Sequence, residues 1–208
     1  MATLEKSRCM VASDDAAILG LIRGQGVELT IWERSLLPAL EAWLVTLDLS
    51  AIGQIRFDLE PTGMRGSIMR NLISAGYPAG ASLDLFADDM MMIVKTFVGV
   101  TDADLLDFRL EVVTTDACRK FHADYVSVRL ITTYAGQATQ WIDGIPSPEI
   151  EVQQMHAGDV GLFKGRLAVE TPRILHRSPP IANTGDRRLL LVLNPERREI
   201  YTDELKPR

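Results

Sequence analysis

Cysteine is scarce in this sequence of 208 residues, and long runs of basic residues are missing. The two cysteines, Cys9 and Cys118, lie far apart in the chain, so they provide no disulfide framework of the kind that holds small secreted domains together. The formal net charge is −6 at pH 7, and Lys and Arg form no long cluster. This charge pattern disfavours nucleic acid as a partner, and it provides no basic stripe for a membrane surface.

Targeting and membrane-spanning segments are also missing. The first twenty residues contain Glu5, Asp14 and Asp15 and no apolar stretch after a basic start, which is untypical of a secretory signal. The longest apolar stretch, residues 90–100, is interrupted by Lys95 and is too short to span a bilayer. We therefore expect a bacterial-type cytoplasmic protein with reduced cysteines that acts on a small-molecule substrate. Its oligomeric state is left open by these patterns.

The chain is long enough for one sizeable core, and no repeat or linker divides it, so we expect a single domain over residues 1–208. Residues 1–104 are predicted to be a mainly helical N-terminal part. Alternating polarity and apolar spacings of three and four predict its strands over 27–32 and 55–59 and its helices over 33–47 and 82–98. Ser82 is the expected N-cap of the second helix, and the methionines from Met90 to Met92 are expected to pack in the core.

Residues 105–208 change to a period of two, which is typical of strands. Stretches rich in β-branched and aromatic residues alternate with turns at Gly, Pro and Asn, as in a β-barrel or jelly roll. The predicted strands cover residues 107–113, 125–134, 139–142, 160–164 and 188–193, with a turn at Gly136. The expected fold class is α+β, with N-terminal helices packed on a metal-binding C-terminal β-barrel.

Two of the three histidines stand in contexts that suggest a metal site. His122 and Asp124 belong to an H-A-D triplet, and residues two apart in extended backbone point to the same face. Their imidazole and carboxylate can therefore reach one ion, and His176, in an H-R-S-P-P segment, offers a second imidazole. Such a ligand set leaves positions open for O₂ and a bidentate co-substrate, which suits Fe(II) chemistry. We predict that His122, Asp124 and His176 are the metal ligands and the catalytic centre.

Four further residues are candidates for binding the co-substrate. A bound dicarboxylate needs a fixed cation, and Arg offers a bidentate fork. Arg187 and Arg188 follow His176 at the start of the last strand, and the strand phase leaves the choice between them open. Tyr134 and Arg129 lie in the strand after the triplet and could also contact the co-substrate, although ordinary strand packing or a surface charge is the more common explanation for either residue.

Cys118 provides an alternative interpretation, because it stands four residues before His122 and could reach the same ion. One Cys, two His and one Asp could close a tetrahedral zinc site, and a closed site has no room for O₂. The protein would then be a non-enzymatic, cupin-like zinc-binding protein. In the other interpretation, Cys118 is a small packed residue and the metal site stays open.

The order of these motifs carries a resemblance. H-A-D, then G-D-V-x-x-x-K-G from Gly158, then H-R-S-P-P with a basic pair after it, resembles the 2-oxoglutarate/Fe(II)-dependent oxygenases, especially the phytanoyl-CoA hydroxylase-like branch. The resemblance implies a double-stranded β-helix fold, with His122, Asp124 and His176 as iron ligands and Arg187 on the far carboxylate of 2-oxoglutarate.

Over nearly the whole chain, C-R-x-F-H-x-D-Y and R-L-x-x-T-Y-x-G also resemble a bacterial family known as a domain of unknown function. Together these likenesses imply an oxygenase or hydroxylase of an unknown small substrate, with Fe(II), or alternatively zinc, and 2-oxoglutarate as cofactors.

Overall fold

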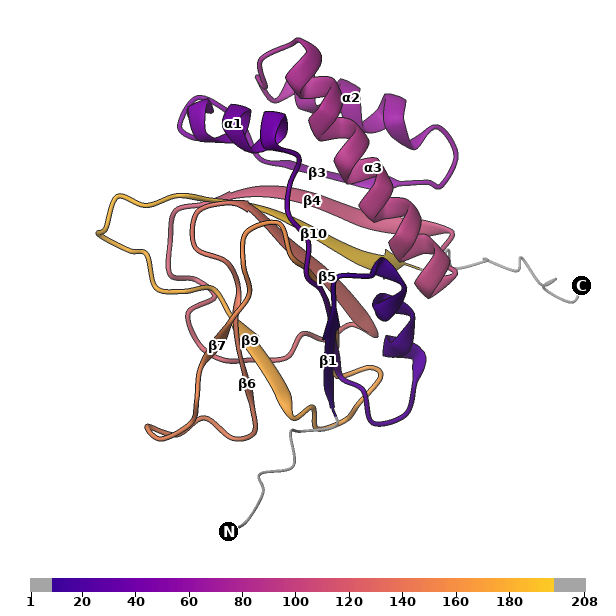
Figure 1. Cartoon of the computed structure of the whole chain (residues 1–208), viewed down its shortest axis with the longest axis vertical. Helices are drawn as coiled ribbons and strands as arrows, with labels where there is room; N and C mark the ends of the chain where they lie inside the picture. The colour runs from indigo at the N-terminus through magenta and orange to yellow at the C-terminus, as the bar shows by residue number, and fades with distance from the viewer. Residues whose placement is uncertain (1–8, 197–208) are drawn as a thin grey trace, which may run out of the picture.

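Two β-sheets form the centre of the computed structural model, which describes residues 9–196 (Figure 1). The major sheet has the order β1 (Met10–Ser13), β2 (Leu29–Trp32), β8 (Val160–Lys164), β5 (Val128–Ala135), β10 (Arg188–Glu196), β4 (Leu105–Val113) and β3 (Ile55–Leu59). The minor sheet has the order β7 (Gln153–Gln154), β6 (Gln140–Asp143) and β9 (Ile174–Arg177). Their arrangement is a double-stranded β-helix, so the predicted fold class is confirmed.

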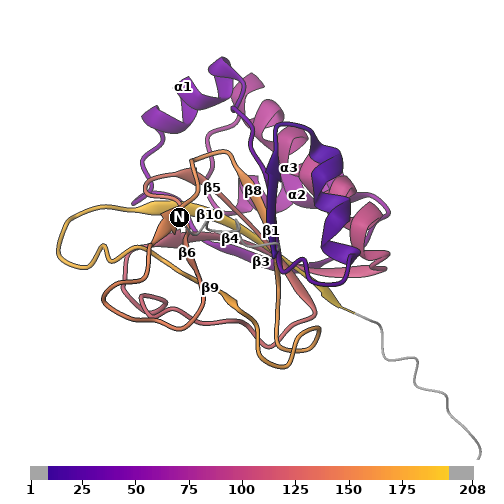
Figure 2. The same ribbon diagram turned by 60° about the horizontal axis from the view of Figure 1, so that its bottom comes forward.

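The helices cover one face of the major sheet, and the minor sheet lies on the other side (Figures 1 and 2). They are the 3₁₀ helix η1 (Ala16–Arg23) and the α-helices α1 (Pro38–Thr46), α2 (Met64–Ser74) and α3 (Ala81–Thr101). Helix α3 buries Phe86, Met90, Val94 and Phe97, whose spacing of three and four places them along one side. Of the three methionines predicted to pack in the core, Met90 is buried and Met91 is partly buried, but Met92 is 40% exposed, so the prediction is wrong for Met92. Within residues 9–196, no helix is both long and apolar enough to cross a membrane.

Strand β10 shows how the sheet separates two interiors. Leu189, Leu191 and Leu193 belong to the core under the helices, whereas Leu190 and Val192 belong to a second apolar cluster between the two sheets. Because successive side chains of a strand point to opposite faces, both sides of β10 are buried. We call the side toward the minor sheet the concave face and the side toward the helices the helical face.

The ends of several predicted elements are different in the structure. Helix α1 begins at Pro38 rather than at residue 33, because proline favours the first helical turn and keeps Leu37 extended. Ser82 is not an N-cap: α3 begins at Ala81, and Gly80 precedes it without a side-chain cap. The strand predicted from residue 125 begins at Val128.

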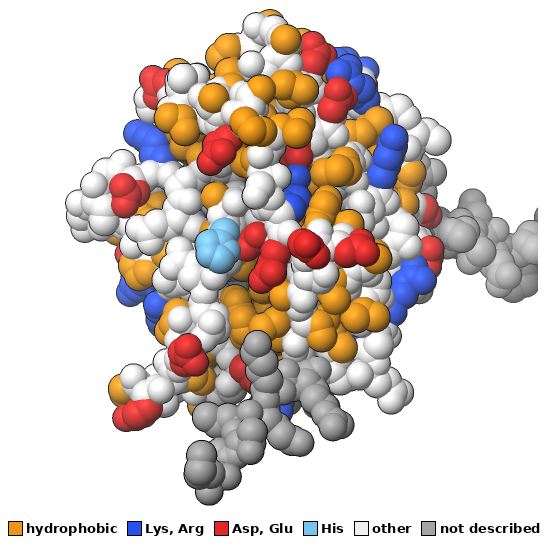
Figure 3. All heavy atoms as spheres, viewed as in Figure 1, with side chains coloured by type: hydrophobic (Ala, Val, Ile, Leu, Met, Phe, Trp, Pro, Cys, Tyr) orange, Lys and Arg blue, Asp and Glu red, His pale blue; other side chains and the backbone are white. Residues whose placement is uncertain are grey.

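Three strands of the N-terminal part complete the major sheet: β2 lies beside β8, β1 lies beside β2 at the edge, and β3 lies beside β4. The two halves of the chain therefore share one sheet. Prediction from the sequence had missed the strands β1, β7 and β9, the 3₁₀ helix η1 and helix α2. Figure 3 shows the outer surface in the view of Figure 1, where acidic side chains gather across the middle, in line with the negative net charge.

Candidate metal centre

The two predicted histidine ligands lie directly opposite each other on neighbouring segments. The backbone N–H of His122 donates to the carbonyl of His176 at 3.0 Å, and the N–H of His176 donates back at 2.9 Å. The centroids of their rings are 4.8 Å apart. This isolated antiparallel bridge brings together imidazoles that are distant in the sequence.

Asp124 completes the group. Its Oδ2 lies 3.1 Å from Nε2 of His176, and its Oδ1 lies 3.8 Å from Nε2 of His122. One ligand atom from each of the three residues can be chosen so that all lie within 4.8 Å of one another. The backbone around Asp124 is irregular, and the carbonyl oxygen of Asp124 accepts a hydrogen bond from the N–H of Arg166 at 2.8 Å. The neighbouring Gly165 permits this approach, because a Cβ there would lie 2.7 Å from the Asp124 carbonyl oxygen.

The protonation states of the three side chains suit a cation. Nδ1 of His122 lies 2.8 Å from the Lys120 carbonyl oxygen, so it carries the proton and Nε2 keeps a free lone pair. Burial lowers the pKa of His176 below its usual value, although the neighbouring Asp124 acts in the opposite direction. This lowered pKa keeps the imidazole neutral. Burial opposes ionisation of Asp124, but His176, Arg129 and His122 outweigh it and lower the pKa of this carboxyl.

The same side chains contain buried polar atoms without hydrogen bonds. Oδ2 of Asp124 and Nδ1 of His176 are both shielded from solvent and have no hydrogen-bond partner. A buried acceptor without a partner costs about 1–3 kcal/mol. A cation between the carboxylate and the two Nε2 atoms would satisfy Oδ2 of Asp124, so the donor set fits a metal ion.

A cavity of about 440 Å³ opens beside the three ligands. His122 and His176 form part of its wall, and Ile131, Leu190 and Val192 supply apolar surface from the concave face. Its remaining lining residues include Gln54, Arg109, Glu111, Cys118, Arg129, Thr139 and Ser178. The cavity therefore combines an apolar floor with several polar side chains.

Arg188 is completely buried behind Thr139 and Ser178, two residues that line this cavity and contact its guanidinium. Its Nε donates to the Gln137 carbonyl at 2.5 Å, and Nη1 donates to Oγ of Ser178 at 2.6 Å. Its Nη2 lies 3.4 Å from the hydroxyl oxygens of Thr133 and Thr139. No carboxylate of residues 9–196 forms an ion pair with Arg188, and burial lowers its pKa to about 10, so it remains charged at neutral pH. A buried cation without a counter-ion is suited to holding an anionic ligand.

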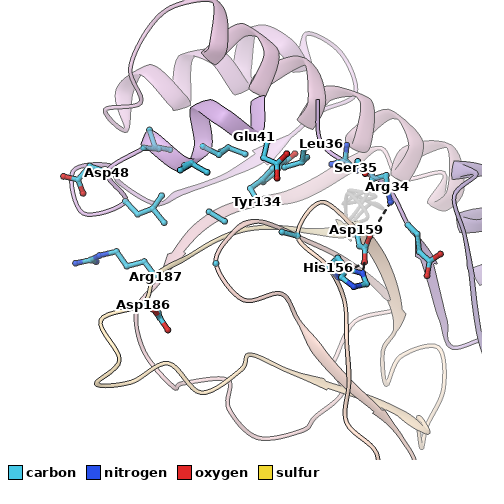
Figure 4. Close-up of a pocket in the computed structure, with 18 of the residues that line it drawn as sticks. Arg34, Ser35, Leu36, Glu41, Asp48, Tyr134, His156, Asp159, Asp186 and Arg187 are labelled. Atoms are coloured by element: carbon cyan, nitrogen blue, oxygen red, sulfur yellow. Dashed lines mark hydrogen bonds and ion pairs between the residues drawn. The ribbon is translucent and has the colours of Figure 1, made fainter. Parts of the chain in front are cut away.

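Arg187 and Tyr134 do not reach this cavity. Tyr134 points to the helical face, where its hydroxyl donates to Asp89 at 2.7 Å. Arg187 lines a different hollow of about 1010 Å³ beneath helix α1, together with Asp48 (Figure 4). Both side chains therefore project away from the concave face, and the contacts of neither residue test the prediction that it binds the co-substrate.

Arg129 does lie at the site, but its partners are protein side chains. Its Nη1 is 2.5 Å from Oδ1 of Asp124, and its Nε donates to Oδ1 of Asn194 at 2.8 Å. Both contacts join it to groups that prediction from the sequence had not paired with it. Nothing in its contacts tests the prediction that it also binds the co-substrate.

Cys118 lines the same cavity, but it is not part of the group of ligand atoms. Its side chain is exposed, and its backbone carbonyl accepts a hydrogen bond from Ser178 N–H at 2.9 Å. The described residues therefore do not form the closed site of four protein ligands that the zinc alternative required. Thr139, Ser178 and Asn194 were missed, although the position of Ser178 two residues after His176 was a usable signal.

The fold has recognisable relatives among solved structures. The chain is similar to the 2-oxoglutarate complex of dioxygenase for auxin oxidation 1 from Arabidopsis thaliana, with a TM-score of 0.58 at 9% identity over 89% of this chain and 91% of that one. The rice dioxygenase for auxin oxidation gives a TM-score of 0.49 at 10% identity, over 89% and 82% of the two chains. A Pseudomonas putida prolyl-4-hydroxylase gives 0.46 at 13% identity, over 88% and 98%.

No protein of curated function matches the sequence. A family described as "Protein of unknown function (DUF1826)" matches residues 13–194, which is most of the chain and includes every residue of the metal centre. The chain therefore belongs to this family, and its fold is the double-stranded β-helix of the Arabidopsis dioxygenase.

Proposed function

We propose that this protein is an Fe(II)- and 2-oxoglutarate-dependent oxygenase that acts on a small molecule. The observation that carries the proposal is Arg188, a fully buried guanidinium without a counter-ion, whose partners Ser178 and Thr139 line the cavity beside His176. A dicarboxylate co-substrate that chelates a metal at one end needs such a cation for its other end. The Arabidopsis dioxygenase of the same fold was solved with 2-oxoglutarate, which supports this choice.

Each residue of the site has a role in this proposal. His122, Asp124 and His176 would hold the metal, and Arg188 would bind the far carboxylate of 2-oxoglutarate. When bound, Fe(II) and 2-oxoglutarate would activate O₂, since oxidation of 2-oxoglutarate to succinate and CO₂ would take up one oxygen atom and the other would be inserted into a substrate C–H bond. Ile131, Leu190 and Val192 would keep water away from the co-substrate.

The three-residue ligand set favours iron over a structural zinc site. Two imidazoles and one carboxylate leave coordination positions free, which a non-haem Fe(II) oxygenase needs and a structural zinc site lacks. Cys118, the residue that would have closed the site, stays outside the ligand group.

The test is anaerobic addition of Fe(II) and 2-oxoglutarate, followed by visible spectroscopy. We expect the weak charge-transfer band of the metal–2-oxoglutarate chelate, and we expect His176→Ala to abolish it. No band from a protein that demonstrably binds the metal would overturn the oxygenase proposal.

Arg187 and Arg188 provide a matched pair for the co-substrate end of the site. They are adjacent in sequence, but only Arg188 is buried beside the cavity. Arg188→Gln should raise the 2-oxoglutarate concentration that gives half of the maximal charge-transfer absorbance roughly a hundredfold. The reason is that a charge-assisted bidentate contact is worth about 2–3 kcal/mol. Arg187→Gln should behave like the wild type, and equal effects of the two substitutions would refute the assignment of Arg188.

A further inference from the structure

Arg129 makes a direct contact with one side of the Asp124 carboxylate. Its side chain extends from β5 on the concave face and is 17% exposed. Nη1 lies 2.5 Å from Oδ1 of Asp124, whereas Oδ2 of the same carboxylate makes no hydrogen bond and lies 3.1 Å from Nε2 of His176. The two oxygens of Asp124 are therefore in different surroundings: one meets a guanidinium and the other faces the candidate metal position.

The guanidinium is itself held by a further chain of contacts. Oδ1 of Asn194 accepts from Nε of Arg129 at 2.8 Å, and Nδ2 of Asn194 donates to Oδ2 of Asp107 at 3.1 Å. The amide of Asn194 is locked in this orientation, because a flip would turn its NH₂ toward the guanidinium and its oxygen toward a carboxylate.

Asp107 is the last residue in this series of contacts, and its own position is fixed by further ion pairs. Its side chain is 4% exposed, and it also forms ion pairs with Arg56 and Arg109. These contacts overcome the opposing effect of burial and lower the pKa of Asp107 to about 2, so it remains an anion at any physiological pH. The position of Arg129 is thus set by buried and charged neighbours rather than by solvent.

We propose that Arg129 is a positioning residue that makes Asp124 a metal ligand through a single oxygen, Oδ2. A carboxylate that binds through both oxygens takes two coordination positions, and the second would be lost to the co-substrate or to O₂. The guanidinium holds Oδ1 toward itself, so Oδ2, which has no hydrogen bond, is the oxygen that faces the ion. This inference rests on the proposed metal site and adds to it the control of how many positions stay open.

A different role would be direct binding of 2-oxoglutarate by Arg129. That role does not involve the Asp124 carboxylate, and it would have no effect before the co-substrate is added. The two roles can therefore be separated by a measurement on the metal-loaded protein alone.

Mn(II) is a suitable probe, because the relaxation rate of water protons reports how many water molecules the bound ion exchanges. Three protein ligands on a six-coordinate ion leave about three positions for water, and a second Asp124 oxygen would remove one of them. We therefore expect Arg129→Gln to lower the relaxation enhancement of the Mn(II)-loaded protein by about a third. Arg129→Lys, which retains a positively charged donor for Oδ1, should restore much of it.

Arg177→Gln is the matched control, since Arg177 lines the same cavity but donates to Oε1 of Gln140 and is not part of the contacts that hold Arg129. It should leave the relaxation enhancement unchanged, and Asn194→Ala, which loosens Arg129, should lower it less than Arg129→Gln does. Thermal denaturation of each variant confirms that it is folded before the relaxation is compared.

The outcomes separate this inference from the function on which it rests. If the wild type binds no Mn(II), both the metal site and the role of Arg129 are overturned. If the wild type binds Mn(II) but Arg129→Gln has the wild-type relaxation enhancement, only the role of Arg129 is overturned. A loss of 2-oxoglutarate affinity with unchanged relaxation would assign Arg129 to the co-substrate.

Discussion

The two faces of the major sheet bury charge in opposite ways. On the helical face, Arg34 and Asp89 form a bidentate ion pair at 2.6 and 3.0 Å, and the Tyr134 hydroxyl adds a third bond to the same carboxylate. Both charged side chains are only 8% exposed. On the concave face, Arg188 is buried without any carboxylate partner, and Oδ2 of Asp124 has no hydrogen bond.

This difference separates structural charge from functional charge. The opposite charges of Arg34 and Asp89 compensate each other, although Nε of Arg34 has no hydrogen-bond partner, so this pair joins helix α3 to the segment before α1 without needing a ligand. A buried cation without a counter-ion and a buried acceptor without a hydrogen bond are costly to the protein alone. Both groups lie beside one cavity, and bound ligands would compensate them: an anion at Arg188 and a cation at Asp124.

Replacing each buried arginine with methionine gives the largest expected effect and tests this comparison directly. Arg34→Met leaves Asp89 buried without its cation, which should cost about 3–5 kcal/mol of unfolding free energy. Arg188→Met leaves no charge behind, and its lost hydrogen bonds are offset by the removed desolvation cost, so we expect a change within about 1 kcal/mol. Urea denaturation measures both, and equal losses would break the distinction between the faces.

The parts of the site that could be predicted from the sequence are those that depend on local patterns. His122, Asp124 and His176 were identified because their residue types are rare and their chemistry is specific, and the structure brings them together. Strand β8 was predicted with its observed bounds, since Gly158 and Gly165 mark both of its ends. Local patterns of this kind depend on neighbouring residues alone.

What the sequence did not reveal is the face of each side chain in strands that are buried on both sides. From Leu189 to Leu193 every residue of β10 is buried, so no alternation reveals which face Arg187 or Arg188 joins. The face of Tyr134 could not be predicted for the same reason, because the residues from Leu130 to Tyr134 are all buried in β5. Face assignment in such strands depends on pairing with distant strands, which the local sequence does not contain.

Asp107 sharpens the comparison, because it lies on the concave face and yet its ion pairs are complete. Arg109, Arg56 and Asn194 lower its folded-state pKa to about 2, from 3.8 for an ordinary aspartate. A lowered pKa stabilises the fold above the unfolded value and is lost as pH falls, here between about pH 5 and pH 2. The contribution should be about 2 kcal/mol at neutral pH. Unfolding free energies across this range should fall more steeply for the wild type than for Asp107→Asn, and parallel curves would contradict the assignment.

The smallest expected effect concerns two glycines near the start of β10. Gly136 and Gly185 both have positive φ angles, of 81° and 83°, so alanine at either position should cost about 1 kcal/mol in backbone strain. A Cβ on Gly136 would also lie 2.4 Å from the Arg187 carbonyl oxygen and 3.1 Å from Cγ of Arg188, whereas at Gly185 it would meet open space. Gly136→Ala should therefore displace the buried arginine and weaken 2-oxoglutarate binding about tenfold, as about 1.4 kcal/mol of lost contact implies. Gly185→Ala should lose the same amount of stability to backbone strain, without any change in the affinity for 2-oxoglutarate. Titration of the anaerobic Fe(II) complex with 2-oxoglutarate compares the two, and equal affinities would show that the position of Arg188 does not control the anion site.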